Sequence, residues 1–155
     1  MLMLSSPQRD LVRDHGTKLG RILIGFLFFA AGLGMLFIQG PDNVGLYFDS
    51  IGIPFAGFFV WVVIILKITA GAAIMIGKRV GLASASLIGF TIIATLVAHG
   101  NFSDPAQFTQ ALKNLAIVGG LLYLLSYGPG GTYTGRLAPT EEDKDGDGVS
   151  DITLN

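Results

Sequence analysis

The sequence of 155 residues contains no cysteine and little charge. The absence of cysteine excludes disulfide bonds, thiolate metal sites, thiol redox chemistry and a cysteine nucleophile. Charged side chains make up 14% of the chain, whereas soluble domains carry about 25%. The net charge of −1 leaves no basic footprint of the kind that binds nucleic acid. Because 51% of the residues are hydrophobic, we expect a single domain whose solvent is mostly lipid.

Catalytic motifs are also missing from the sequence. It contains no Ser/His/Asp arrangement, no phosphate-binding loop and no HExxH zinc motif. A redox reaction would need a bound cofactor or substrate to carry the electrons, since the chain has no thiol. The sequence therefore favours a protein without catalytic activity of its own.

Four apolar stretches of about 20 residues fill most of the chain, and this is the length a helix needs to cross roughly 30 Å of hydrocarbon. They are Leu19–Ile38, Phe55–Gly77, Val80–His99 and Phe108–Tyr127. Glycines inside them let helices approach closely in lipid, and short connections make successive helices antiparallel neighbours. The predicted fold is an all-α integral membrane protein. Its antiparallel bundle of four transmembrane helices, residues 19–127, lies between an N-terminal segment, 1–18, and an acidic tail, 128–155.

Basic residues predict how the bundle is oriented. Those that flank the apolar stretches all fall on one side of the membrane: Arg9, Arg13, Lys18, Arg21, Lys78, Arg79, Arg136 and Lys144. The two connections on the other side, 39–54 and 100–107, contain aspartate but no lysine or arginine. By the positive-inside rule, both termini and the tight turn between the second and third spans lie in the cytoplasm. We expect a multi-pass protein of the bacterial cytoplasmic (inner) membrane, surrounded by lipid.

The two outer connections carry local structural signals. Gly45–Pro54 is too apolar for a free loop, so we expect a short interfacial helix or turn there, with Tyr47 at headgroup depth. In the second connection, Asp104 is the predicted N-cap and Pro105 the first residue of the fourth helix.

Lys67 is the most unusual residue of the spans, because it lies near the middle of the second one. A charge at that depth costs about 2.5–3.5 kcal/mol on insertion scales and is a functional-site hypothesis by default. No acidic residue lies within any of the four spans. Lys67 could snorkel to the outer surface, be neutral, donate to carbonyl groups, or meet a ligand or a carboxylate of another subunit.

Two further polar residues lie in the outer half of the predicted bundle. Asn114 is in the fourth span and His99 at the outer end of the third. Together with Lys67 they could form a pocket for an amphipathic small molecule such as a quinone. The alternatives are an interhelical hydrogen bond for Asn114 and a helix-terminal or interfacial role for His99.

The acidic tail contains an incomplete calcium-binding pattern, DKDGDGVSD. Its possible ligands are Asp143, Asp145, Asp147 and Asp151, with Gly148 at the turn position. The bidentate glutamate expected at position 12 is absent, since Leu154 occupies it. We therefore consider a weak cation site, possible for Ca²⁺, beside the alternatives of a solvated tail or one that docks on a basic partner surface.

Four segments resemble the DoxX family of small bacterial membrane proteins. They are RILIGFLFFAAGLGML, YFDSIGIP, ATLVAHG and DPAQFTQALKNLAIVGGLLYLLSYGPG, and they cover roughly residues 21–130. The resemblance implies the same four-helix topology. It also brings a link to quinone chemistry, because the family takes its name from the small subunit of a thiosulfate:quinone oxidoreductase.

Two positions depart from the family pattern. Family members often carry a glutamate in the second span where this chain has Lys67, and a lysine late in the first span where it has Met35. The resemblance therefore implies a charge pair between these helices that has been lost or rewired here, which lowers the expectation of catalysis.

Three functional hypotheses remain at this stage. The first is an accessory or structural subunit of a larger respiratory or photosynthetic electron-transfer complex, or alternatively a homo-oligomer. The second is a quinone-linked membrane oxidoreductase subunit of the DoxX type, with Lys67, His99 and Asn114 at its site. The third, a small-solute carrier or channel, ranks last because four helices leave little room for a pore and no inverted repeat is detectable.

Overall fold

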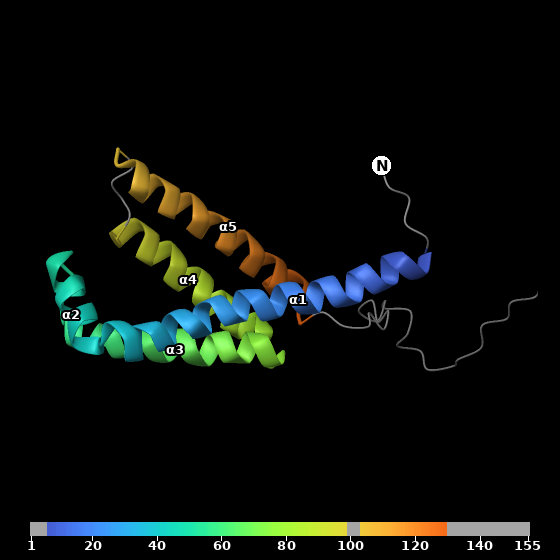
Figure 1. Cartoon of the computed structure of the whole chain (residues 1–155), viewed down its shortest axis with the longest axis horizontal. Coiled ribbons are helices and arrows are strands. Elements are labelled where there is room, and N and C mark those ends of the chain that lie inside the picture. Colours follow the sequence, from blue (N-terminus) through green and yellow to red (C-terminus); the bar gives the residue numbers. More distant parts are fainter. Residues whose placement is uncertain (1–5, 99–102, 130–155) are drawn as a thin grey trace, which may run out of the picture.

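The computed structural model describes residues 6–98 and 103–129, which are almost entirely helical. The elements are α1 (Ser6–Leu33), the π-helical η1 (Gly34–Gln39), α2 (Pro41–Ser50), α3 (Ala56–Ile76), α4 (Val80–Ala98) and α5 (Pro105–Tyr127) (Figure 1). Four helical segments in this part of the chain are long and apolar enough to cross a membrane: His15–Gln39, Ala56–Ile76, Val80–Ala98 and Pro105–Tyr127. The predicted all-α, four-helix membrane fold is confirmed.

The four spanning helices form two antiparallel pairs, α1 with α3 and α4 with α5. The pairs meet at the end of the molecule that carries Arg21 and the Lys78–Arg79 turn, here called the basic end. They diverge toward the opposite end, here called the α2 end, where α2 turns away from the axis of α1 (Figure 1). The arrangement is therefore closed at one end and open at the other.

Two buried clusters reflect this arrangement. The cluster at the basic end draws residues from all four spanning helices: Phe28, Ala70, Ile74, Val80, Ala83, Leu87, Leu121 and Leu124. The cluster at the α2 end contains Met35, Val44, Val60 and Ile64, which belong to η1, α2 and α3 only. Among the described residues, α4 and α5 thus share a buried cluster with α1 and α3 only toward the basic end.

Glycine sets the close approach of α1 and α3. A Cβ atom added to Gly71 would lie 2.7 Å from the backbone nitrogen of Phe29 and 2.8 Å from the carbonyl oxygen of Gly25. A Cβ added to Gly25 would meet the Gly71 oxygen at 2.7 Å. The two backbones are in direct contact at this level, as small residues allow in lipid, where van der Waals packing holds helices together.

The helix ends follow the sequence signals. The Asp104 side chain accepts a hydrogen bond from the Ala106 backbone N–H at 2.9 Å, and Pro105 is the first residue of α5. This confirms the predicted cap. Gly77 ends α3 with a φ of 78°, a left-handed conformation that glycine adopts without steric cost.

The expected interfacial segment is the helix α2. It begins at Pro41, four residues before the predicted segment, because Gly40 breaks the preceding helix with a φ of 80° and proline suits the first helical turn. Val44 is buried against α3, whereas Leu46 and Tyr47 are exposed. This amphipathic arrangement suits a helix at the membrane surface.

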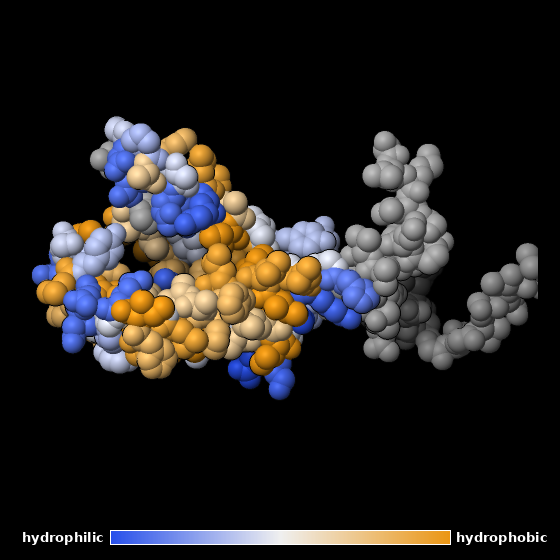
Figure 2. Space-filling view, viewed as in Figure 1, coloured by the Kyte–Doolittle hydropathy of each residue, from blue (hydrophilic) through white to orange (hydrophobic). Residues whose placement is uncertain are grey.

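Large apolar side chains cover the outside of the spanning helices (Figure 2). In the most apolar 18 residues of each spanning helix, no more than 28% of the residues are buried inside the molecule. These side chains are surrounded by lipid rather than by a protein core. The chain can therefore be very hydrophobic and still bury few residues in its interior.

Candidate functional site

Lys67 lies about halfway along α3, roughly 16 Å from its first residue at 1.5 Å of rise per residue. Its Nζ is 3.4 Å from the Sδ atom of Met35 in η1 and 5.1 Å from the ring centroid of Phe90 in α4. A thioether is a weak acceptor, and the face of an aromatic ring attracts a cation. The half-buried ammonium is thus held by a sulfur and a ring, where the two helical pairs diverge.

The path of the Lys67 side chain follows from the glycine opposite it. Gly32 of α1 lies directly against Lys67 Cβ, and the Nζ atom reaches Met35, three residues nearer the α2 end. The side chain therefore leans toward the α2 end, the direction that the snorkelling interpretation requires, and contacts Met35 there. Met35 and Lys67 are also the two positions at which the family resemblance implies opposite charges, and the structure brings them into contact.

The π-helical segment η1 helps to place Met35. Hydrogen bonding from i to i+5 changes the angular spacing of side chains, and such segments are frequent at functional sites. Met35 is 6% exposed, whereas Phe37 and Ile38 are 76% and 87% exposed. The Asn43 side chain donates to the Gln39 carbonyl oxygen at 2.8 Å, which satisfies one terminal carbonyl of this segment.

Asn114 of α5 makes the interhelical hydrogen bond considered from the sequence. Its Nδ2 donates to Thr95 Oγ1 of α4 at 2.9 Å, and that hydroxyl donates to the Thr91 carbonyl oxygen at 2.7 Å. Asn114 and Thr95 also border a groove of about 370 Å³ between α4 and α5. The rest of its lining is apolar: Ile92, Leu96, Phe108, Ala111, Leu112, Leu115 and Val118.

Lys67 and Asn114, the candidate residues of the proposed pocket that the structure describes, do not line one groove. Lys67 contacts α4 at Phe90, whereas Asn114 contacts it at Thr95, and Lys67 is not part of the groove beside Asn114. His99 and the tail aspartates Asp143, Asp145, Asp147 and Asp151 lie outside the described residues. Within residues 6–98 and 103–129, no group of three or more potential ligands could hold a metal ion.

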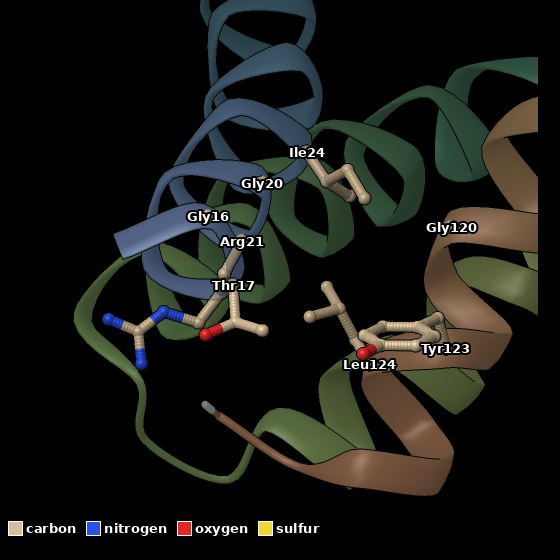
Figure 3. A pocket seen from close by; sticks show the side chains of 8 residues that line it. All are labelled: Gly16, Thr17, Gly20, Arg21, Ile24, Gly120, Tyr123 and Leu124. Carbon is tan, nitrogen blue, oxygen red and sulfur yellow. The ribbon is translucent and has the colours of Figure 1, made fainter. Parts of the chain in front are cut away.

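Sequence reasoning missed a second groove, of about 390 Å³, between α1 and α5 at the basic end (Figure 3). Arg21 borders it, donating from Nη1 to the Pro129 carbonyl oxygen at 2.8 Å and lying against Gly77. Its Nε is buried without a hydrogen-bond partner in the described part of the chain. A sequence signal for this groove was available. Residues spaced by three or four positions share a helix face, and such spacing puts small and polar residues on one face of the first helix: Gly16, Thr17, Gly20, Arg21 and Ile24.

These features define a class: small integral membrane proteins of four spanning helices with a surface helix in the first connection. The DoxX family model matches residues 16–100, and the chain belongs to this family. It is 34% identical over 126 residues to the inner membrane protein YqjF of Escherichia coli K12, an alignment that covers 81% of this chain and 94% of the relative. No solved structure matches the chain. With four spanning helices and an inner-membrane relative, the chain is a multi-pass inner membrane protein.

Proposed function

We propose that this protein is a non-catalytic accessory subunit of a larger inner-membrane complex of respiratory or photosynthetic electron transfer, and that Lys67 marks its docking face. The observation that carries the proposal is the environment of this ammonium. Within the described part of the chain its neighbours are Met35 Sδ and the Phe90 ring, and the four spans contain no acidic residue.

The energies favour a partner for Lys67. A lysine at mid-membrane costs about 2.5–3.5 kcal/mol, while a cation–π contact returns about 0.5–2 kcal/mol and a thioether is only a weak acceptor. A carboxylate on a partner helix would supply the missing stabilisation. The partner that fits is therefore a transmembrane helix with an aspartate or glutamate at the depth of Lys67.

The shape of the molecule supports the same partner. The pairs α1–α3 and α4–α5 diverge toward the α2 end (Figure 1), and the surface is hollowed between the corner of α2 and α3 and the α4 helix (Figure 2). Lys67 lies where this divergence begins, since it touches both pairs. A helix entering from the α2 end would lie beside apolar side chains and reach the ammonium.

The test is gentle extraction of the native membrane in mild detergent, followed by native electrophoresis and mass spectrometry of whatever migrates with the protein. We expect stoichiometric recovery with a larger complex, loss of it in Lys67→Met, and retention in Lys67→Arg. Lys113→Met is the matched control, because Lys113 is an exposed lysine of a different spanning helix. Migration alone or as a small homo-oligomer would overturn the proposal, as would equal effects of the two methionine variants.

A quinone-linked oxidoreductase subunit is the second candidate, and the groove beside Asn114 favours it. A quinone carbonyl could accept from the second Nδ2 hydrogen of Asn114, and the apolar lining suits an isoprenoid tail. Of the three residues expected at such a site, only Asn114 borders this groove, while Lys67 lies elsewhere and His99 is outside the described residues. Stoichiometric quinone in the purified wild-type protein, lost in Asn114→Leu and kept in Lys113→Met, would support this function, and a quinone-free preparation would count against it.

A further inference from the structure

We propose that the groove between α1 and α5 at the basic end binds one anionic phospholipid. This inference does not depend on the accessory-subunit proposal, because it concerns a different face and the opposite end of the molecule. The groove has a volume of about 390 Å³, and it combines a cationic rim with an apolar interior, as the site of a phospholipid requires.

The cationic rim is Arg21. Arg21 lines the groove, and Figure 3 shows its guanidinium on the far side of Thr17 from Tyr123 and Leu124. Nη1 donates to the Pro129 carbonyl oxygen, and Nε has no partner in the described part of the chain. A guanidinium has five N–H donors and matches the oxygens of a phosphate in a bidentate manner. Its charge and its remaining terminal donors are therefore available to a headgroup at the rim.

The interior of the groove suits an acyl chain. The side chains of Ile24 and Leu124 point into the space between α1 and α5 (Figure 3). Gly120 lies so close to Ile24 that an added Cβ would be 2.8 Å from Ile24 Cδ1, which closes the groove at that level. Tyr123 lines the opposite wall and packs against the exposed Tyr127, with ring centroids 4.6 Å apart and the rings tilted by 37°. Tyrosine is enriched at the membrane–water interface, where lipid headgroups lie.

The charge around the groove selects an anionic headgroup. Lys18, Lys78 and Arg79 are exposed at or near the same end, and none of the described side chains in 15–33, 70–87 and 117–129 is acidic. Basic pockets between transmembrane helices are known sites for anionic lipids. The apolar interior distinguishes this site from one for free phosphate, which would have no use for Ile24 and Leu124.

The test uses the purified full-length protein in vesicles of phosphatidylglycerol and phosphatidylethanolamine at equal proportions, with native mass spectrometry of the lipid that remains bound. We expect one phosphatidylglycerol retained in preference to phosphatidylethanolamine. Arg21→Gln should weaken this retention roughly fivefold, the factor for one basic residue at an anionic surface. Arg79→Gln is the matched control, because it removes an equally cationic, exposed side chain that does not line the groove.

A second variant separates the site from a general surface attraction. Gly20 lines the groove with no atom within 4 Å of an added Cβ, so Gly20→Leu fills the groove without changing the charge and should also release the lipid. Equal retention of the two lipids would overturn the proposal, as would equal effects of Arg21→Gln and Arg79→Gln or undiminished retention in Gly20→Leu. Displacement of the lipid by millimolar glycerol 3-phosphate would also overturn it, since the ligand would then be the phosphate alone.

Discussion

The contact between Gly71 of α3 and the backbone of α1 makes a sharp prediction for Gly71→Ala. An alanine Cβ would lie 2.7 Å from the Phe29 nitrogen, whereas ordinary contacts begin near 3.4 Å, so α1 must retreat by about 0.7 Å. A gap of 0.5–1 Å forfeits about a quarter to a half of each dispersion contact. Overpacking of this kind costs about 1–3 kcal/mol, and the better helix propensity of alanine returns up to about 1 kcal/mol. We expect a net loss of about 1–2 kcal/mol.

The assay is unfolding by sodium dodecyl sulfate in mixed micelles, followed by the fluorescence of Trp61, the single tryptophan of the chain. Gly89→Ala is the matched control, because an added Cβ at Gly89 of α4 meets no atom within 4 Å. That variant should be as stable as the wild type or up to about 1 kcal/mol more stable. Equal stability of the two alanine variants would refute the argument that glycine sets the distance between α1 and α3.

Three further substitutions test local interactions in the same unfolding assay. Thr95→Val removes the hydrogen-bond acceptor of Asn114 and should lower the free energy of unfolding by about 0.6 kcal/mol, with a maximum near 1.7. A double-mutant cycle with Asn114→Leu that shows no coupling energy would contradict this. Asp104→Ala removes the N-cap of α5 and should lower the free energy of unfolding by about 1 kcal/mol, whereas Asp104→Asn should retain most of the stability. Equal losses in the two variants would argue against capping. Ser84→Ala should be neutral or stabilising, because the fully buried Ser84 hydroxyl has no partner in the described part of the chain, and a loss above about 1 kcal/mol would show that it has one.

The spans and their ends could be predicted because they depend on local properties. Hydrophobic length locates a transmembrane helix wherever its neighbours lie, and the cap by Asp104 needs only the residues next to it. The interfacial helix was predicted for the same reason, although its start was placed four residues late. The predicted orientation of the bundle rests on the positive-inside rule and stays a prediction.

The faces by which the paired helices meet could not be predicted, because hydropathy does not say which face of a span meets which neighbour. The contact of Lys67 with Met35 depends on the close approach at Gly32 and on the π-helical turn that follows it. The Arg21 groove depends on how α1 and α5 meet at the basic end. The interhelical hydrogen bond of Asn114 was one of two alternatives drawn from the sequence, and its partner Thr95 was identified only from the structure.

The pairing of α1 with α3 has a consequence for how the protein is made. The backbone contact joins Gly25 to Gly71, which are 46 residues apart in the sequence. At synthesis rates of about 5–20 residues per second, the first span must wait roughly 2–9 s in the bilayer before its partner emerges. During that interval the glycine-bearing face of α1 is open to any other helix nearby. The order of synthesis therefore leaves this protein a short period in which its first helix can pair with the wrong partner.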